Sequence, residues 1–575
     1  MATKTAFEAF EKEKETLAQE SQERQARAKR LSNLRTARTP WESAWMDVSA
    51  YLSPFTLNLV GDKQTTAGDA RLRINNDLYS GAAVRAVDIF ANGFVGNLCP
   101  RGTPWFSLRV HDKQFASGAA VRPWVSDVET HIADRYDQSN FYEAIFIMAK
   151  QAAAYGTSAM YIKPDIATKD IIFNVLEIGS YWIDEDENGT VDTLYRQFWM
   201  QGRNIIREFR DEVEKDANIL KTLEEGQFEF FKIIHSVQPR EDYDKDDESN
   251  KNFPFESVYT LEGQDNFELR CSGFKSFPFA VWRFRKEPGY TYGIGPGIDA
   301  LRDGEIMQQV AKTMLKADHM ATEPPILLPM EMRNNEDELQ LFPGGRNYYD
   351  GPNPDAVRPI NMTQTVIGHQ REEMLRRSLN DHFFVDFMMM LQGATRQMTA
   401  QEVIEKQAEK AAVLSTIIGR FNSELMDIVF QRIVEIDYDL GLLPDLPEGL
   451  PLDKLNLDYV GPLAMVQKYY HRNAGTQRFL GQILPLSQAY PQMLDRIDPD
   501  SLVDDAADAN NVSPKIIVPK DKADKKRQAV AQAQQAAIQN SAQQQAMQQA
   551  AEFAQKAGKA PEPGSLANIM VNGGR

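Results

Sequence analysis

The 575-residue sequence predicts an α+β protein that is mainly helical, and three observations lead to this fold class. Helix-forming composition and helical spacing of apolar residues dominate both ends of the chain. Strand-like runs of β-branched and aromatic residues are confined to residues from about 157 to 285. A composition of 42% hydrophobic and 25% charged residues is that of a globular protein, with length for several domains.

The N-terminal part of the chain is expected to be helical. Residues 5–36 are rich in Ala, Glu, Gln, Lys and Arg, which predicts an exposed helix that Pro40 and Trp41 end. Further helical segments are expected over residues 45–52, 76–98 and 126–155, the last being one helix or a pair with Gly156 as C-cap.

A mixed β region follows. Strands are expected over residues 157–162, 171–176, 181–184, 191–200, 228–237, 257–261, 267–271 and 277–284. Asn188-Gly189 separates two of them and predicts a two-residue type I′ hairpin turn, because both positions of that turn need a positive φ.

Two long helical segments, 296–321 and 366–390, flank a Pro/Gly-rich patch at 323–359. Beyond a Gly-containing break, the Thr399–Glu402 capping box starts the longest helix. If this helix runs to Leu440, it is on the order of 60 Å long at ~1.5 Å per residue. A helix of that length favours a chain that crosses a larger assembly.

The C-terminal part leaves two interpretations open. Residues 465–497 are again helical in pattern, and 521–556 are Ala/Gln-rich without Pro or Gly. This tail is either disordered or a helix that is stable only when it is bundled with copies of itself. Residues 558–575 are expected to be disordered.

Charge and composition exclude several classes of protein. The net charge of -18 argues against tight, stationary DNA binding, which relies on phosphate neutralisation, but it fits a conduit wall that lets DNA slide. Two distant cysteines without metal-type spacing fit a reducing cytoplasm. The charged N-terminus does not look like a secretory signal, and the apolar run 383–391 is too short to span a bilayer.

The motifs do not indicate an enzyme, a cofactor or a metal. A phosphate-binding loop and a His-Glu-x-x-His pair are both missing from the sequence. The stretch 293–297, Gly-Ile-Gly-Pro-Gly, is expected to be a turn that leads into a helix. Asp184, Asp186 and Asn188 match the first half of a calcium loop, but Tyr195 stands where the bidentate Glu is needed.

Lys312 and Lys316 lie one helical turn apart in the segment that follows Pro296. Such a pair usually belongs to a solvated face. If the helix lines a channel, the same pair repeated in every subunit would form stacked cationic rings that face phosphate groups.

Several stretches of this sequence, in the same order, resemble portal proteins of short-tailed bacteriophages. They are Ala91–Phe106, Ser139–Phe141 with Tyr155–Met160, Tyr292–Pro296 with Ala300–Asp303 and Glu323–Pro325, and Met398–Val403 with Glu424-Leu425 and Gly441–Pro444. Together they span residues from about 40 to 450.

The resemblance implies a portal fold arranged as a ring, typically of twelve subunits. Its parts would be an N-terminal helical extension (1–39), the wing (40–295), stem helix 1 (296–322), the clip (323–365), stem helix 2 (366–391), the channel loop (392–397), the long wing helix (398–449), the crown (450–515), a barrel helix or disordered segment (516–557) and a disordered tail (558–575).

The resemblance also implies site residues and partners. Candidates that face DNA are Lys312, Lys316, Gln392, Gly393, Thr395 and Arg396. Candidates for docking at the clip are Pro343, Gly344, Gly345 and Arg346. The partners would be double-stranded DNA without sequence specificity, the terminase large subunit, tail adaptor and nozzle proteins, and capsid and scaffold proteins.

The expected location is the capsid vertex of the virion, after assembly in the host cytoplasm and with no membrane partner. Two alternatives come from other classes. A packaging nuclease–ATPase lacks support, because no phosphate loop or carboxylate metal motif is visible. A scaffold or tail adaptor fits less well, because scaffolds seldom contain a large β region and adaptors are usually shorter.

Overall fold

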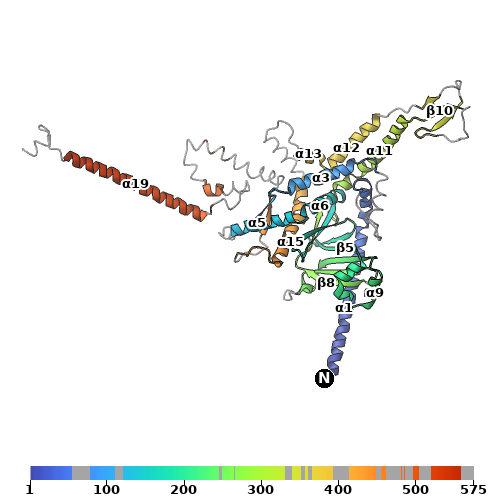
Figure 1. Ribbon diagram of the computed structural model, residues 1–575, viewed down its shortest axis with the longest axis horizontal. Helices are drawn as coiled ribbons and strands as arrows, with labels where there is room; N and C mark the ends of the chain where they lie inside the picture. Colours follow the sequence, from blue (N-terminus) through green and yellow to red (C-terminus); the bar gives the residue numbers. More distant parts are fainter. Residues whose placement is uncertain are drawn as a thin grey trace, which may run out of the picture. The chain divides into compact units, whose positions relative to one another are not determined.

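The computed structural model forms two compact units, residues 1–112 with 127–474 and residues 113–126 with 475–575. The described residues are 2–54, 78–110, 121–244, 249–264, 266–330, 340–350, 357–360, 366–392, 414–447, 455–460, 479, 481, 483, 485, 497–503, 518 and 520–557. Helices and strands both contribute substantially, which confirms the α+β class (Figure 1).

The first unit contains a five-stranded antiparallel sheet with the order β4-β5-β6-β7-β8 (Figure 1). Its strands are β4 (Tyr181–Glu185), β5 (Val191–Gln201), β6 (Phe230–Pro239), β7 (Phe255–Leu261) and β8 (Phe267–Phe274). All five lie in the region where the sequence predicts strands.

Helices cover both faces of this sheet. Successive residues of a strand point to opposite faces, so two neighbouring residues of one strand contact different helices. On β6, Ile233 packs with α7 (Gly202–Glu208), α8 (Arg210–Val213) and α9 (Ala217–Glu225), three short helices that the sequence pattern did not reveal. The adjacent Ile234 packs instead with Leu31 and Leu34 of α1 (Ala2–Tyr51).

Helix α1 continues through Pro40, so the prediction that this residue ends the helix is wrong. Proline removes one backbone hydrogen bond and normally kinks or stops a helix. Here both sides of Pro40 are held by packing, with Leu34 on one side and the fully buried Trp45 and Val48 on the other. Tertiary contacts therefore override the local preference.

A second sheet, β3-β2-β9, contains β2 (Thr157–Pro164), β3 (Ile171–Leu176) and β9 (Phe279–Arg283), and it packs against α6 (Phe141–Tyr155). Helix α3 (Ala82–Leu98) packs on α6, and Tyr136 of α5 (Val121–Gln138) contacts Phe141 at the start of α6. Gly156 caps α6 with a φ of 84°, and its N–H donates to Ala152, which confirms the predicted C-cap.

The hairpin between β4 and β5 is present, but its turn is not type I′. Gly189 has a φ of 79°, whereas Asn188 has no positive φ. The Asp186 carboxylate instead accepts hydrogen bonds from the backbone N–H groups of Asn188 and Thr190, at 2.9 and 2.7 Å. The acid of the calcium-like motif therefore stabilises its own turn.

The Gly-rich stretch 293–297 lies directly against the end of α6 and leads into α10 (Pro296–Asp299). A Cβ atom at Gly297 would be 2.2 Å from the carbonyl oxygen of Ala154, and one at Gly295 would be 2.5 Å from that of Ala152. The glycines thus allow two backbones to touch, which agrees with the predicted turn into a helix.

Two long helices, α11 (Leu301–Thr322) and α12 (Val366–His382), pack against each other and lead to a small sheet (Figure 1). That sheet has the order β11-β10-β12 and contains β10 (Ile326–Pro329), β11 (Arg346–Tyr349) and β12 (Arg358–Pro359). The Pro/Gly-rich patch of the sequence therefore includes strands.

The segment predicted as one helix over 366–390 is broken. Helix α12 ends at His382, and α13 (Val385–Gln392) begins after Phe384, which has a φ of 54°. The described part of the long helix covers 414–439, with a π-helical turn at Phe421–Met426 before α15 (Asp427–Asp439). Its predicted start at Thr399 lies outside the described residues.

The strand β13 (Leu455–Tyr459) pairs with β1 (Phe106–Val110) inside the first unit, and a short 3₁₀ helix covers Asn250–Asn252. In the second unit, α19 (Lys520–Ala557) shows that the Ala/Gln-rich tail is helical. Arg527 near its start pairs with Asp500. Most of the predicted helical segment 465–497 lies outside the described residues.

Candidate functional site

The root of the α11–α12 hairpin is fixed by polar contacts. The Gln308 side chain is 4% exposed; its Oε1 accepts the N–H groups of Tyr79 and Ser80, and its Nε2 donates to the Ser80 carbonyl. The Ser378 hydroxyl of α12 donates to Asp303 of α11. These hydrogen bonds hold the base of the hairpin in place against the rest of the first unit.

The outer part of the hairpin has little core of its own. The buried residues of α11 all lie in its first eight positions and are Gly304, Met307 and Gln308. Leu315 on α11 and Met374 on α12 are 45% and 62% exposed. Two helices with so little buried surface need further packing partners to be stable.

The two candidate lysines differ in their surroundings. Lys312 is exposed, but its ammonium group lies 5.0 Å from the centre of the Tyr79 ring, a cation–π contact with the segment before α3. Lys316 is exposed one turn further along α11. Gln392 is the last residue of α13, and Gly393, Thr395 and Arg396 lie outside the described residues.

The four candidate residues of the clip form one turn and the start of β11. Gly344 has a φ of 70° and donates its N–H to Glu323, while Gly345 donates to Phe342. Arg346 is exposed, and Phe342 beside it is 54% exposed. Of the four candidates, Gly344 and Arg346 are exposed, Pro343 is partly buried and Gly345 is buried, so only part of the stretch can meet a partner.

A buried ion-pair network connects the second sheet to the long helix. The Arg283 guanidinium, 1% exposed, donates to Glu185 and Glu424 at 2.7 Å each and to the Gly189 carbonyl at 2.7 Å. Glu424 lies in the π-helical turn and also accepts from Arg420 at 2.6 Å. Sequence patterns gave no signal for this network, because its members are up to 239 positions apart (424 − 185).

A stacked aromatic and charged cluster stabilises the five-stranded sheet. His235 is fully buried, stacks on Tyr259 at 3.9 Å, and accepts a hydrogen bond at Nδ1 from Arg196. Burial, with Arg196 and Arg270 nearby, holds the pKa of His235 well below its ordinary value. The ring is therefore neutral at physiological pH, and its role is structural.

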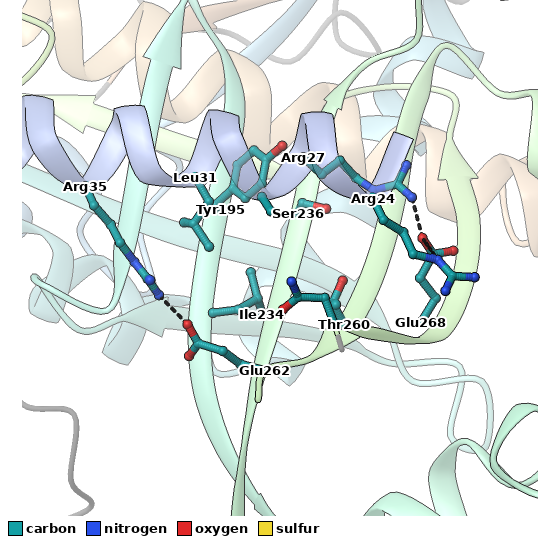
Figure 2. Close-up of a pocket in the computed structure, with 12 residues that line it drawn as sticks. Arg24, Arg27, Leu31, Arg35, Tyr195, Ile234, Ser236, Thr260, Glu262 and Glu268 are labelled. Carbon is teal, nitrogen blue, oxygen red and sulfur yellow. Dashed lines mark hydrogen bonds and ion pairs between the residues drawn. The ribbon is translucent and has the colours of Figure 1, made fainter. Parts of the chain in front are cut away.

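Ion pairs attach helix α1 to the same sheet. Figure 2 shows Arg24 and Arg27 reaching Glu268, and Arg35 reaching Glu262 at 2.8 Å. A cavity of about 150 Å³ remains between helix and sheet. Its charged lining residues pair with one another, and the rest of the lining is apolar or uncharged polar side chains, so the cavity resembles an imperfectly filled interface more than a ligand pocket.

Among the described residues, no group of three or more His, Cys, Asp or Glu could hold a metal ion. In the same part of the chain, no helix is both long and apolar enough to cross a membrane. The described residues show instead a helical hairpin with an exposed outer part, an exposed turn around Phe342 and Arg346, and buried ion-pair networks.

Comparisons with known proteins show the class of protein to which the chain is similar. The family model described as bacteriophage head to tail connecting protein matches residues 24–518. A "Probable portal protein" of Bordetella phage BPP-1 is 30% identical over 517 residues, covering 88% of this chain and 91% of the relative. A "Portal protein" of Salmonella phage epsilon15 is 29% identical over 520 residues, with the same two coverages.

The chain therefore belongs to the family of bacteriophage head-to-tail connecting proteins. The resemblance stated from its motifs is confirmed over almost the whole chain. The family is one of structural components of the phage particle, acting where head and tail meet.

Proposed function

We propose that several copies of this protein form a ring at one capsid vertex, through which double-stranded DNA enters and leaves the head. The observation that carries this proposal is the α11–α12 hairpin, whose outer part lacks a core of its own. Neighbouring hairpins in a ring would cover one another, since a heterologous contact repeated by rotation closes on itself.

In this proposal α11 and α12 are the stem, and β10, β11 and β12 with their loops are the clip. The sheets and the helices around them are the wing, residues 392–397 are the channel loop, and residues 450–515 are the crown. The ring has about twelve subunits, as the family resemblance implies. Packaging energy comes from a partner motor, because the sequence offers no phosphate loop.

Electron microscopy of the purified full-length protein tests the ring directly. Top views with a central hole wide enough for a duplex are expected, together with a mass by light scattering of about twelve chains. Monomers under all conditions of salt and concentration would contradict the proposal.

Lys316 is the stronger candidate to face DNA, because Lys312 already contacts Tyr79. Charge reversal by Lys316→Glu should reduce the DNA packaged per head, while Lys221→Glu, an exposed lysine of α9, should leave it unchanged. Equal amounts of packaged DNA with both variants would contradict the proposal that Lys316 faces the channel.

The clip is proposed as the docking site for the terminase large subunit and later for tail adaptors. Arg346 and the neighbouring Phe342 present a charge and an apolar ring, a combination common at interface centres. Arg346→Glu and Phe342→Ser should each weaken terminase capture in a pull-down while rings still form. Unchanged capture by both variants would place the docking site elsewhere.

The helix α19 is proposed to join copies of itself in a helical barrel. Val530 and Ile538 are 57% and 66% exposed in a single chain, and Ala residues are distributed around the helix. Deleting residues 520–557 should remove density from one end of the ring without dissolving the ring. Identical images before and after deletion would contradict the barrel.

A further inference from the structure

The hairpin between β4 and β5 carries the dipeptide Asn188-Gly189 in its turn. In a flexible chain this dipeptide is prone to deamidation, because Gly has no side chain to hinder attack by its backbone nitrogen. The nitrogen loses its proton and forms a C–N bond to the carbonyl carbon of the Asn side chain. The bond from that carbon to the side-chain nitrogen breaks, and ammonia leaves after taking up a proton. Water then opens the cyclic imide to aspartate or isoaspartate, so the net reaction consumes one water and releases one ammonia.

Water has access to this turn, but hydrogen bonds hold the attacking nitrogen. Asn188 and Thr190 are exposed. Cyclisation requires rotation about the backbone bonds that join Asn188 to Gly189. The Gly189 N–H, however, donates to the carbonyl oxygen of Asp186 at 3.0 Å, and the Gly189 carbonyl accepts from Arg283 at 2.7 Å. Both polar backbone groups of the glycine are therefore fixed.

The Asp186 carboxylate holds the remaining groups of the turn. Its Oδ1 atom accepts the backbone N–H groups of Asn188 and Thr190, at 2.9 and 2.7 Å, and its Oδ2 atom accepts the side-chain N–H of Asn188 at 3.4 Å. The hydrogen bond from Thr190 also lowers the pKa of Asp186, so the carboxylate is ionised at neutral pH. A negative charge beside the turn opposes loss of the Gly189 proton, which is the first step of the reaction.

The products of the reaction fit this turn poorly. Isoaspartate lengthens the main chain by one carbon, and both products add a negative charge beside Asp186. Space at Gly189 is limited, since a Cβ atom there would lie 2.7 Å from Nζ of Lys286, which is itself paired with Glu185 at 2.5 Å. A displaced Gly189 carbonyl would leave the buried Arg283 without one of its acceptors. Deamidation would therefore loosen the contact between the hairpin and the buried ion-pair network.

We propose that Asn188 is a latent deamidation site and that Asp186 suppresses the reaction by keeping the turn closed. Cyclisation then proceeds only during brief local openings of the hairpin. An opening that leads to product is irreversible, because ammonia is lost, and it detaches the Gly189 carbonyl from Arg283. Asp186 is a positioning residue for the turn. The inference goes beyond the proposed function, because it holds for a single chain as well as for a ring.

Mass spectrometry of the full-length protein tests the proposal. The protein is incubated at mildly alkaline pH in heavy-oxygen water, so that only deamidation during the incubation carries the label, and the labelled fraction at Asn188 is followed over time. A synthetic peptide of residues 183–194 is the unfolded reference. Four backbone hydrogen bonds must open in the protein, and each shifts such an equilibrium by roughly fivefold, so the peptide should react more than about 100-fold faster. A wild-type rate equal to that of the peptide overturns the proposal.

Substitutions at residue 186 separate the hydrogen bonds from the charge. Asp186→Ala removes two backbone hydrogen bonds and should speed deamidation of Asn188 about 25-fold. Asp186→Asn keeps an oxygen acceptor without the charge, so its rate should lie below that of the Ala variant. Glu187→Gln is the matched control, because it removes the neighbouring charge and leaves these hydrogen bonds in place; its rate should be that of wild type. Equal rates in wild type and Asp186→Ala, or the same acceleration by Glu187→Gln, overturn the role of Asp186.

The dipeptide Asn92-Gly93 in α3 provides an internal reference in the same digest. The Asn92 side chain donates to the Asp88 carbonyl at 2.9 Å, within the helix. No substitution lies in α3, so the labelled fraction at Asn92 should be the same in wild type and in every variant. An equal rise at Asn92 and Asn188 in Asp186→Ala would indicate general unfolding and would overturn the local role of Asp186.

Ageing experiments connect the reaction to the Arg283 network. The Asp186→Ala protein should become less stable to urea during incubation, in step with the labelled fraction at Asn188. Adding Asn188→Ser removes the carboxamide and should abolish that progressive loss, because no cyclic imide can form. The same loss with and without Asn188→Ser overturns the connection. If Asp186→Ala fails to fold, the comparison of wild type with the peptide decides the proposal.

Discussion

A Cβ atom added at Gly297 tests how α10 and α6 are held together. Gly297 has no positive φ, so an alanine there meets no backbone strain and acts only through contact. Its Cβ atom would be 2.2 Å from the Ala154 carbonyl oxygen and 2.9 Å from the Ala154 Cα. Ordinary contact begins at 3.4 Å, so the two backbones must separate by about 1.2 Å (3.4 − 2.2).

Because the neighbour is backbone, no side-chain rotation relieves the clash. Overpacking in a well-packed core typically costs 1–3 kcal/mol, and a contact with backbone belongs at the upper end. We therefore expect Gly297→Ala to lower the free energy of unfolding by about 3 kcal/mol. Pro296 and Ala300, both buried, would lose packing at the same time.

Urea unfolding of the full-length protein, followed by tryptophan fluorescence, measures the effect. The matched control is Gly96→Ala in α3, where a Cβ atom meets nothing within 4 Å. That control should raise stability by roughly 0.5–1 kcal/mol, because alanine is a better helix former. If Gly297→Ala unfolds within about 0.5 kcal/mol of wild type, the close backbone approach is wrong.

Three further perturbations follow from buried contacts. Arg283→Met should lower the unfolding free energy by about 3 kcal/mol in urea titrations, because two carboxylates lose a buried partner; no loss would refute this. Gly93→Ala should cost about 1–3 kcal/mol, because its Cβ atom would lie 2.5 Å from the Met388 Cβ; unchanged stability would refute the contact. His235→Gln should reduce the loss of stability that the wild type shows as the pH falls below about 6.5. The pKa of His235 is lowered in the folded state, so only the unfolded state takes up a proton there, which costs the wild type up to ~1.4 kcal/mol per pH unit. An unchanged slope would contradict that.

Local patterns determined the elements whose signal lies within one turn or one strand. Runs of β-branched and aromatic residues placed the strands, and Gly156 ended α6 because only glycine readily takes its φ of 84°. The shared order of short motifs was sufficient for the family, since those residues meet local needs such as turns and caps. The acidic composition argued against tight, stationary DNA binding, because phosphate attraction needs positive charge.

Only the tertiary structure decided where helices bend and which charges are buried. Pro40 stays inside α1 and Phe384 breaks a run without Gly or Pro, because packing on distant elements outweighs local preference. Arg283 finds Glu185 and Glu424 from far along the chain, and the sequence has no local signal for such a pairing. A burial-dependent interaction is a property of the fold, since the low dielectric that makes it strong exists only after the core has formed.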